Sequence, residues 1–436
     1  MSASKAQRSP VHLLIVSYAF PRAGSGWGGE VGGERMRQFA RLLPQHGIRV
    51  SILTHRGAAA GNADLQRWAA LDLSRLAVEG MTALKAQRTS KPSAGTNPRE
   101  GWTASRVRTA ARRWVVPDRA TYAWAPFAVA AGLRRAHTQP GAPQVVLSSS
   151  PPFAAHVVAY TLAKTWGIPW IADVRDGYSF EPPEGYSPLR AVRRRLEQTL
   201  YAHAARVFTV TEALSDDLRT LLPARRDRIE TIENGFDAAL FETPTPRPAS
   251  SRDDWTVLYA GSVSFGAGRN LRALMTGVDR ISTQSHQTVR LQLIGIFAPS
   301  DVAPGLQHAR LQLCGWQARS EVARSMQAAD VLVVLTGNHK TVATTKLYEY
   351  IGAGRPILVV GRQSAAARIV SEGQFGLVTD DDPNGIAAAL TQLQRERAAW
   401  EAHLQSPPVC SARARFSRET QAAQLAAHVH ALLATD

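Results

Sequence analysis

The strongest hydrophobic pattern of the chain is an apolar run followed by an amphipathic segment. Residues 331–335, VLVVL, are wholly apolar and rich in valine, as in a strand buried on both faces of a parallel sheet. After a polar segment, apolar residues return at helical spacing, with Leu347, Tyr350 and Ile351 on one side. Glycines and a proline end this helix, and residues 357–360 form the next strand. The pattern predicts a strand, loop, helix and strand unit.

The same alternation occurs in both halves of the chain. The N-terminal half opens with strands at VHLLIV and IRVSIL around a glycine-rich loop and a helix, and the other half repeats this design from DWTVLYAG. A chain of 436 residues is long enough for two cores. We therefore predict an α/β fold of two Rossmann-like domains facing across a cleft. The N-terminal domain takes residues 1–240, a proline-rich linker 241–254 and the C-terminal domain 255–405.

Residues 57–117 interrupt this alternation and are predicted to be a basic insertion. Residues 65–76 have a helical pattern, and a polar segment at 87–101 follows. Residues 85–119 carry nine basic side chains and two acidic ones, with two tryptophans among them. Such a segment suits an anionic membrane surface or an acidic acceptor. Nucleic acid is the rival interpretation, and biased arginine usage is the simplest one, since only 6 of the 51 basic residues are lysines.

The net charge of +16 is concentrated in the first half. Residues 1–250 hold 33 Lys and Arg against 20 Asp and Glu, and the remainder holds 18 against 15. The two cysteines, Cys314 and Cys410, provide neither a disulfide framework nor a metal site, which fits a reducing cytoplasm. No apolar run approaches the ~20 residues that cross a bilayer. We therefore expect a cytoplasmic protein, peripheral on the inner face of the membrane if the insertion binds lipid.

Polar residues at the start of the helix near residue 345 predict a nucleotide site. A helix N-terminus after a parallel strand offers N–H groups and partial positive charge to a phosphate. Thr344 and Thr345 lie at this entrance, and Lys346 adds a full charge. Glu349, one turn further on, could accept both hydroxyls of a ribose. The alternative is an ordinary cap with solvated surface charges.

A second polar group follows the strand predicted at IPWIADV. Asp173, Arg175 and Asp176 lie at its carboxyl end, where open α/β sheets bind ligands. Asp176 could act as a base for an acceptor hydroxyl or position it. These three residues and Lys346 are the predicted catalytic residues. The alternative is an Asp–Arg ion pair that only holds the loop.

Residues 346–358, KLYEYIGAGRPIL, resemble the donor-binding segment of GT-B glycosyltransferases of the GT4-type family. The resemblance is to bacterial members that build surface polysaccharides and share a K-x-Y/F-E-Y motif. It implies that Glu349 holds the nucleotide ribose and that the preceding loop meets the diphosphate and the donor sugar. Most of the family has a second glutamate where Thr341 stands here, so the resemblance indicates no particular sugar.

The resemblance extends to other loops of the chain. It implies a Gly-Gly pair facing the diphosphate across the cleft, a donor loop with a basic residue, and a turn against the nucleobase. A serine replaces an arginine that is frequent in that donor loop. The residues concerned are Gly32, Gly33, Gly261, Ser262, Arg269 and Trp316. A tryptophan in the core is the alternative for the last.

The family further implies a function and a partner for each side of the cleft. It implies retaining transfer of a sugar from a nucleotide-diphosphate donor, UDP rather than GDP, to a saccharide or lipid-linked acceptor, without metal or cofactor. It also implies that residues 406–436 form a helix crossing back to the first domain. Two rivals remain open. A nucleotide-sugar 2-epimerase shares the architecture but would need carboxylates near the sugar, and a basic nucleic-acid binder leaves Glu349 unexplained.

Overall fold

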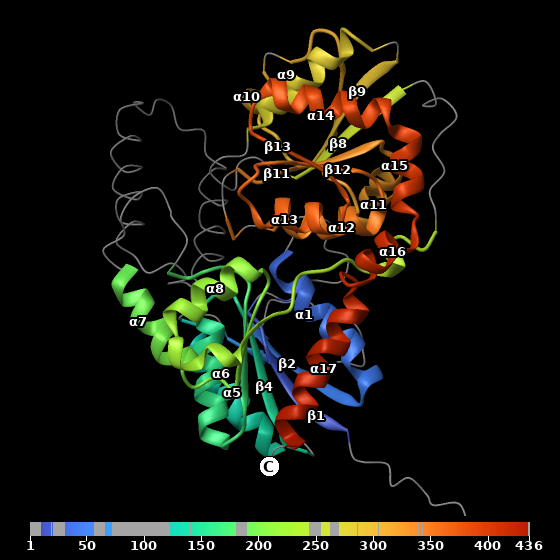
Figure 1. The fold of residues 1–436 in the computed structure, drawn as a ribbon. Helices are drawn as coiled ribbons and strands as arrows, with labels where there is room; N and C mark the ends of the chain where they lie inside the picture. Colours follow the sequence, from blue (N-terminus) through green and yellow to red (C-terminus); the bar gives the residue numbers. More distant parts are fainter. Residues whose placement is uncertain are drawn as a thin grey trace, which may run out of the picture.

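The computed structural model has two α/β domains stacked one above the other, joined by two crossings of the chain (Figure 1). The parts of the chain that the structure describes are residues 10–18, 20, 31–55, 66–71, 123–138, 141–179, 190–243, 254–261, 270–285, 287–303, 305–337, 340–341 and 343–434. The predicted basic insertion therefore lies outside the described residues, except for its strand at 66–70.

The N-terminal domain contains a seven-stranded sheet in the order β3-β2-β1-β4-β5-β6-β7, and every pairing in it is parallel. Its strands are β1 Val11–Val16, β2 Ile48–His55, β3 Gln66–Ala70, β4 Val145–Ser150, β5 Trp170–Val174, β6 Arg206–Thr209 and β7 Ile229–Thr231. The described helices that cover it are α1 Val31–Leu42, α5 Ala125–Thr138, α6 Ala154–Trp166, α7 Arg190–Tyr201 and α8 Glu212–Leu221.

The C-terminal domain contains a six-stranded parallel sheet in the order β10-β9-β8-β11-β12-β13. Its strands are β8 Asp254–Ala260, β9 Thr288–Ile294, β10 Arg310–Gly315, β11 Val331–Leu335, β12 Ile357–Val360 and β13 Gly376–Thr379. Its helices are α9 Leu271–Ser282, α10 Pro299–Val302, α11 Arg319–Ala328, α12 Thr345–Ala353, α13 Ala365–Glu372, α14 Pro383–Arg395, α15 Arg397–Leu404 and α16 Pro407–Ala414.

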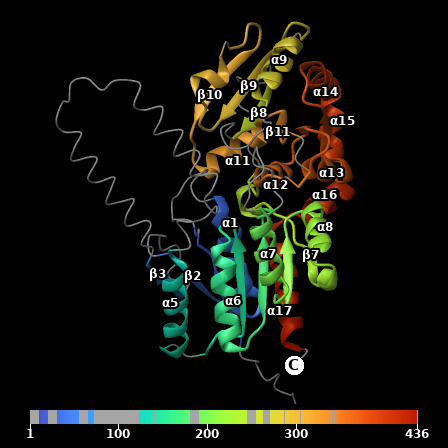
Figure 2. The ribbon, with the colours of Figure 1, turned by 90° about the vertical axis from the view of Figure 1, so that its left-hand side faces the viewer.

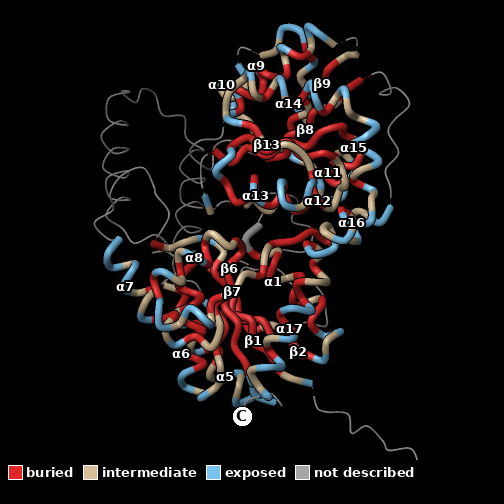
Figure 3. Tube along the Cα trace, viewed as in Figure 1, coloured by how far each residue is buried: buried red, intermediate tan, exposed pale blue. Residues whose placement is uncertain are grey.

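The central strands of both sheets are buried between layers of helices, which explains the continuous apolar runs of these strands (Figure 3). β11 is buried along its whole length, and so are β4 and β5. Each sheet has one apolar cluster on either face. The predicted fold class, two Rossmann-like domains of α/β type, is thereby confirmed.

One secondary-structure prediction is wrong. The helical pattern expected at residues 65–76 is in part the edge strand β3, which pairs in parallel with β2. In β3 only Trp68 and Ala70 are buried, two residues apart on one face. In a strand of only five residues, the alternation of buried and exposed positions is too short to identify it as a strand when its alanines favour a helix.

The last helix, α17 Arg418–Ala434, packs on the N-terminal domain beside α1 (Figures 1 and 2). Phe236 in the connection between the domains and Phe416 before α17 are joined by a backbone hydrogen bond of 2.9 Å. A Cβ on Gly235 would lie 2.4 Å from the Phe416 carbonyl, so this close approach requires glycine. The two crossings between the domains therefore lie against each other.

Candidate functional site

The topology gives each domain one sheet edge at which a ligand can bind. The strand order reverses between β1 and β4 in the first sheet and between β8 and β11 in the second. At such a switch point the loops after the carboxyl ends diverge and leave a crevice for ligands. Asp173 lies near the end of β5, Arg175 and Asp176 follow that strand, and residues 344–349 come after β11, so both predicted sites lie at carboxyl ends of strands.

The helix α12 begins without a side-chain cap. Its N-cap residue is Thr344, and the Thr344 Oγ1 atom is buried without a hydrogen-bond partner among the residues that the structure describes. The first N–H groups of α12 therefore remain available to an anion. Thr345 is the first residue of the helix, and Lys346 follows it. The alternative of an ordinary threonine cap is not observed.

The Lys346 ammonium lies directly over Gly261, which follows β8. A Cβ added to Gly261 would lie 2.2 Å from Lys346 Nζ, so the missing side chain makes room for the ammonium. The Gly261 N–H donates to the Ile294 carbonyl at 2.7 Å, and the Gly295 N–H donates to the Gly315 carbonyl at 2.8 Å. Backbone hydrogen bonds thus join the ends of β8, β9 and β10 next to the lysine. Ser262 and Arg269 lie outside the described residues.

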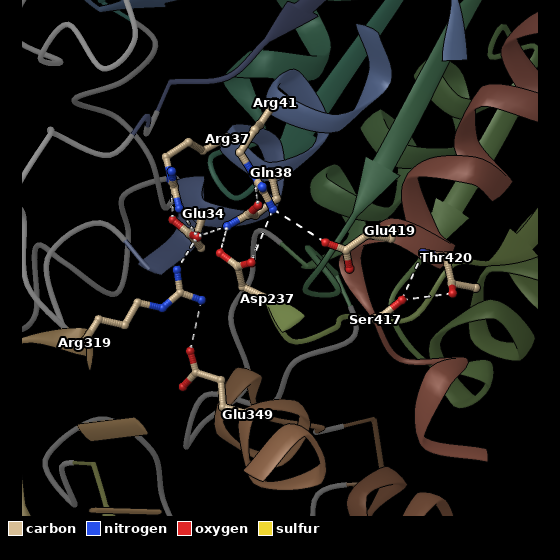
Figure 4. A network of polar contacts seen from close by, with 10 residues as sticks. All are labelled: Glu34, Arg37, Gln38, Arg41, Asp237, Arg319, Glu349, Ser417, Glu419 and Thr420. Atoms are coloured by element: carbon tan, nitrogen blue, oxygen red, sulfur yellow. Dashed lines mark hydrogen bonds and ion pairs between the residues drawn. The ribbon is translucent and has the colours of Figure 1, made fainter. Parts of the chain in front are cut away.

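Glu349 is not a solvated surface charge. Its side chain is only 6% exposed and accepts a hydrogen bond of 3.2 Å from Arg319 at the start of α11 (Figure 4). The other end of the Arg319 guanidinium donates to Glu34 of α1, in the opposite domain. One arginine therefore joins the carboxylate expected to bind ribose to the N-terminal domain.

Glu34 is fixed by a network within α1. Arg37 donates to both of its carboxylate oxygens, at 2.7 and 2.6 Å, and Gln38 donates at 2.8 Å. Gln38 also donates to Asp237 in the domain connection, at 2.8 Å. Burial alone would raise the pKa of Glu34, but the hydrogen bond from Arg37 and the charge of Arg319 lower it to about 2. Glu34 is therefore ionised at neutral pH.

Asp173 forms a buried ion pair with Arg35 of α1. Arg35 Nε donates to Asp173 Oδ1 at 3.0 Å, and Ser149 Oγ donates to Oδ2 at 2.8 Å. The aspartate and arginine side chains are each 2% exposed. The remaining Arg35 nitrogens donate to the carbonyls of Ile232 and Glu233. Asp173 thus holds α1 and the domain connection in place, and this buried position does not suit the contact with substrate expected from the sequence.

Arg175 and Asp176 follow β5 at the surface. Arg175 donates to Ser149 Oγ and the Ser150 carbonyl, each at 3.1 Å, and to the Pro151 carbonyl at 2.9 Å. It braces the turn after β4 and does not form the Asp–Arg pair considered as the alternative; Arg35 supplies that pair. Asp176 is exposed. Desolvation by the surrounding protein nevertheless raises the pKa of Asp176, an effect that the charge of Arg175 partly offsets.

The loop that carries Asp176 is fixed at its far end by Glu197 of α7. This fully buried glutamate accepts a hydrogen bond from the Tyr178 N–H at 3.2 Å and another from the Ser179 hydroxyl. Burial raises the pKa of Glu197 to about 7, despite these hydrogen bonds. The sequence shows only a glutamate among arginines on a helix, so this role is a finding of the structure.

Glu197 makes the free energy of unfolding depend on pH. Between pH about 4.5, the ordinary value, and about 7, the folded protein holds a proton that the unfolded chain releases, so stability falls as pH rises. Glu197→Gln should therefore stabilise the protein at pH 8 by about 2 kcal/mol and change little at pH 5. Urea unfolding at both pH values measures this, with the exposed Glu372→Gln as control. Equal shifts at both pH values would contradict it.

Further residues considered in the sequence analysis lie in the described part of the chain. Gly32 and Gly33 are in the first turn of α1, next to Glu34. Trp316 follows the end of β10 and is 52% exposed, so the alternative of a core tryptophan is wrong. Thr341, at the position of the family's other glutamate, accepts a hydrogen bond through its carbonyl from Thr211 of the N-terminal domain at 3.2 Å. The loop expected to meet the donor sugar thus contacts the opposite domain.

Two family models match the chain, one in each domain. Residues 32–235 match the model described as "Glycosyl transferase 4-like domain", and residues 254–396 match "Glycosyl transferases group 1". Each domain of the chain therefore matches a model of a glycosyltransferase domain, and the fold is the one shared by the solved structures that follow. No curated protein matches the sequence significantly.

Solved structures show the same fold at low sequence identity. A sucrose-phosphate synthase from Thermosynechococcus elongatus is 17% identical, with a TM-score of 0.67 and 98% of this chain and 100% of that chain covered. HepE from Anabaena, in complex with UDP and glucose, is 14% identical, with a TM-score of 0.60 and coverage of 97% and 99%. A putative UDP-N-acetylglucosamine 2-epimerase from Listeria monocytogenes is 12% identical, with a TM-score of 0.56 and 98% of each chain covered.

Proposed function

We propose that the protein is a retaining glycosyltransferase that moves a sugar from a nucleotide-diphosphate sugar to a saccharide or lipid-linked acceptor. The observation that carries this proposal is the start of α12, where uncapped N–H groups, the Lys346 ammonium over Gly261 and the buried Glu349 lie within two helical turns. A diphosphate needs positive charge and N–H donors, and a ribose needs an acceptor for its two hydroxyls. The segment provides both in the order in which a nucleotide carries them.

The same groups supply what departure of the diphosphate requires. As the bond between the sugar and the phosphate breaks, negative charge grows on the leaving oxygen. The α12 N-terminus and Lys346 are oriented before the reaction and stabilise that charge without reorganisation. We expect this electrostatic stabilisation to replace a metal ion, with no cofactor required. UDP is the preferred nucleotide of the proposal.

The acceptor would bind on the N-terminal side of the crevice, near Asp176. This carboxylate is exposed beyond the end of β5, and its raised pKa keeps it basic enough to take a proton from a hydroxyl. Arg175 and Glu197 hold its loop at either end. We infer an acceptor hydroxyl at Asp176, delivered by a saccharide or a lipid-linked sugar of a surface polysaccharide or glycolipid.

The experiment that tests the function combines binding and turnover. A thermal-shift panel of UDP-, GDP- and dTDP-sugars should show stabilisation by one nucleotide class, and the stabilising donor should then label a saccharide acceptor. Release of free 2-epimer without any acceptor would identify an epimerase instead. Stabilisation by none of the donors, with tight and salt-dependent binding of duplex DNA, would favour a nucleic-acid protein.

The basic segment at residues 85–119 gives a prediction about location. No helix in the described part of the chain is long and apolar enough to cross a membrane. If the segment docks the enzyme on the inner face of the membrane, deleting it should abolish sedimentation with anionic vesicles and spare hydrolysis of the donor. Vesicles of neutral lipid are the control. A full-length protein that does not sediment with anionic vesicles would contradict the docking.

A further inference from the structure

Arg319 is placed between two carboxylates that belong to different domains. Its guanidinium donates to Glu34 on one side and to Glu349 on the other, and it lies at the start of α11, directly after the short connection 316–318 that follows β10 (Figure 4). The arginine is 21% exposed, and the two glutamates are 15% and 6% exposed. The three groups thus form a largely buried bridge from one domain to the other.

The bridge requires an arginine and a defined position of both carboxylates. A guanidinium carries several donors in a rigid plane, so it can bond two carboxylates at once, whereas a lysine ammonium is a single point charge. The charges of Glu349 and Glu34 raise the pKa of Arg319, although burial acts against its charge. Removing one member of a buried ion pair is costly because the other charge stays buried.

The Glu34 end of the bridge cannot follow Arg319 freely. Arg37 donates hydrogen bonds to both oxygens of Glu34. Gln38 donates to Glu34 and also to Asp237 in the domain connection. The Glu349 end is set by the buried helix α12. Arg319 can therefore reach both carboxylates only when the two domains stand in a particular arrangement.

We propose that Arg319 is a positioning residue that couples ribose recognition to the arrangement of the domains. One hydrogen bond from Arg319 fixes the orientation of the Glu349 carboxylate, and Glu34 of the opposite domain fixes the position of Arg319. A carboxylate has about four acceptor positions, so Glu349 can keep this bond while it accepts two ribose hydroxyls. Glu34 would thereby set donor affinity without touching the donor. The inference rests on the proposed nucleotide site.

A double-mutant cycle tests the coupling. UDP, GDP and dTDP are titrated in parallel by calorimetry into the wild type, Arg319→Gln, Glu34→Gln and the double variant. For the nucleotide that binds, Arg319→Gln should raise the Kd roughly tenfold and Glu34→Gln roughly threefold. The double variant should be no weaker than Arg319→Gln alone, because Glu34 acts only through the arginine. Arg324→Gln, an exposed position on the same helix, is the matched control.

Two further readouts separate positioning from general damage to the fold. Arg319→Lys keeps the charge and should recover only part of the affinity. With saturating donor, kcat of Glu34→Gln should stay near the wild type while the donor KM rises. The inference is overturned if Glu34→Gln leaves the Kd unchanged. It is also overturned if Glu34→Gln weakens binding by the same factor in the Arg319→Gln variant as in the wild type. Glu349→Ala distinguishes the failures: if it too binds nucleotide normally, the proposed site itself is wrong.

Discussion

Replacing Asp176 by Asn should lower sugar transfer to the acceptor by ~10²-fold and leave donor binding nearly intact. Asp176 follows β5 in the N-terminal domain, whereas the groups proposed for the donor lie in the other domain. An Asn of the same shape keeps the loop but cannot take a proton. The raised pKa of Asp176 means that its basic form, and with it the wild-type transfer rate, increases as pH rises through that pKa. In the variant, the transfer rate should no longer show this increase with pH.

The comparison needs both a donor readout and a control aspartate. Calorimetric affinity for the nucleotide should match the wild type, and the rate of acceptor labelling should carry the whole effect. Asp227→Asn, exposed in the same domain, should behave as the wild type. Transfer at the normal rate in Asp176→Asn would reduce that residue to a neighbour of Arg175, and the donor half of the proposal would still stand.

The elements that could be predicted from the sequence are those whose signal is local. β11 and α12 have an apolar run and a helical period that identify them without any partner. The glycine and proline that end α12 fix the start of β12 to within a residue. Because parallel strands must end at a common edge, these local assignments already place residues 344–349 and 173–176 at ligand edges.

The ion pairs could not be predicted because they join segments far apart in the chain. Arg35 meets Asp173 across 138 positions, and Arg319 meets Glu34 across 285. Nothing in the local pattern distinguishes Arg319 from the other arginines of a chain with a net charge of +16. Asp173 and Asp176 look equivalent in sequence, yet one lies inside the strand and is buried, and the other lies two residues beyond its end and is exposed. Burial, and not residue type, separates the structural carboxylate from the proposed catalytic one.

Glu349→Ala should weaken nucleotide binding by about 1.5 to 3 kcal/mol, roughly tenfold to more than a hundredfold in Kd. The physical reason is that two ribose hydroxyls lose a charged acceptor in a site with little access to water, where the Glu349 side chain is 6% exposed. Glu349→Gln keeps the size of the side chain and should show a large part of the loss, which separates the missing charge from a packing defect. A melting temperature close to that of the wild type is required of both variants.

The ribose itself provides the decisive contrast. If Glu349 accepts both hydroxyls, the wild type should bind UDP more tightly than 2′-deoxy-UDP, because the deoxy compound leaves one carboxylate oxygen without its hydroxyl. Glu349→Ala should bind the two compounds almost equally, since the acceptor that tells them apart is gone. A variant that keeps the full preference for UDP would show that another group reads the ribose, whatever its total loss of affinity. Lys346→Ala, which removes charge from the diphosphate side, should weaken both compounds alike and so preserve the preference.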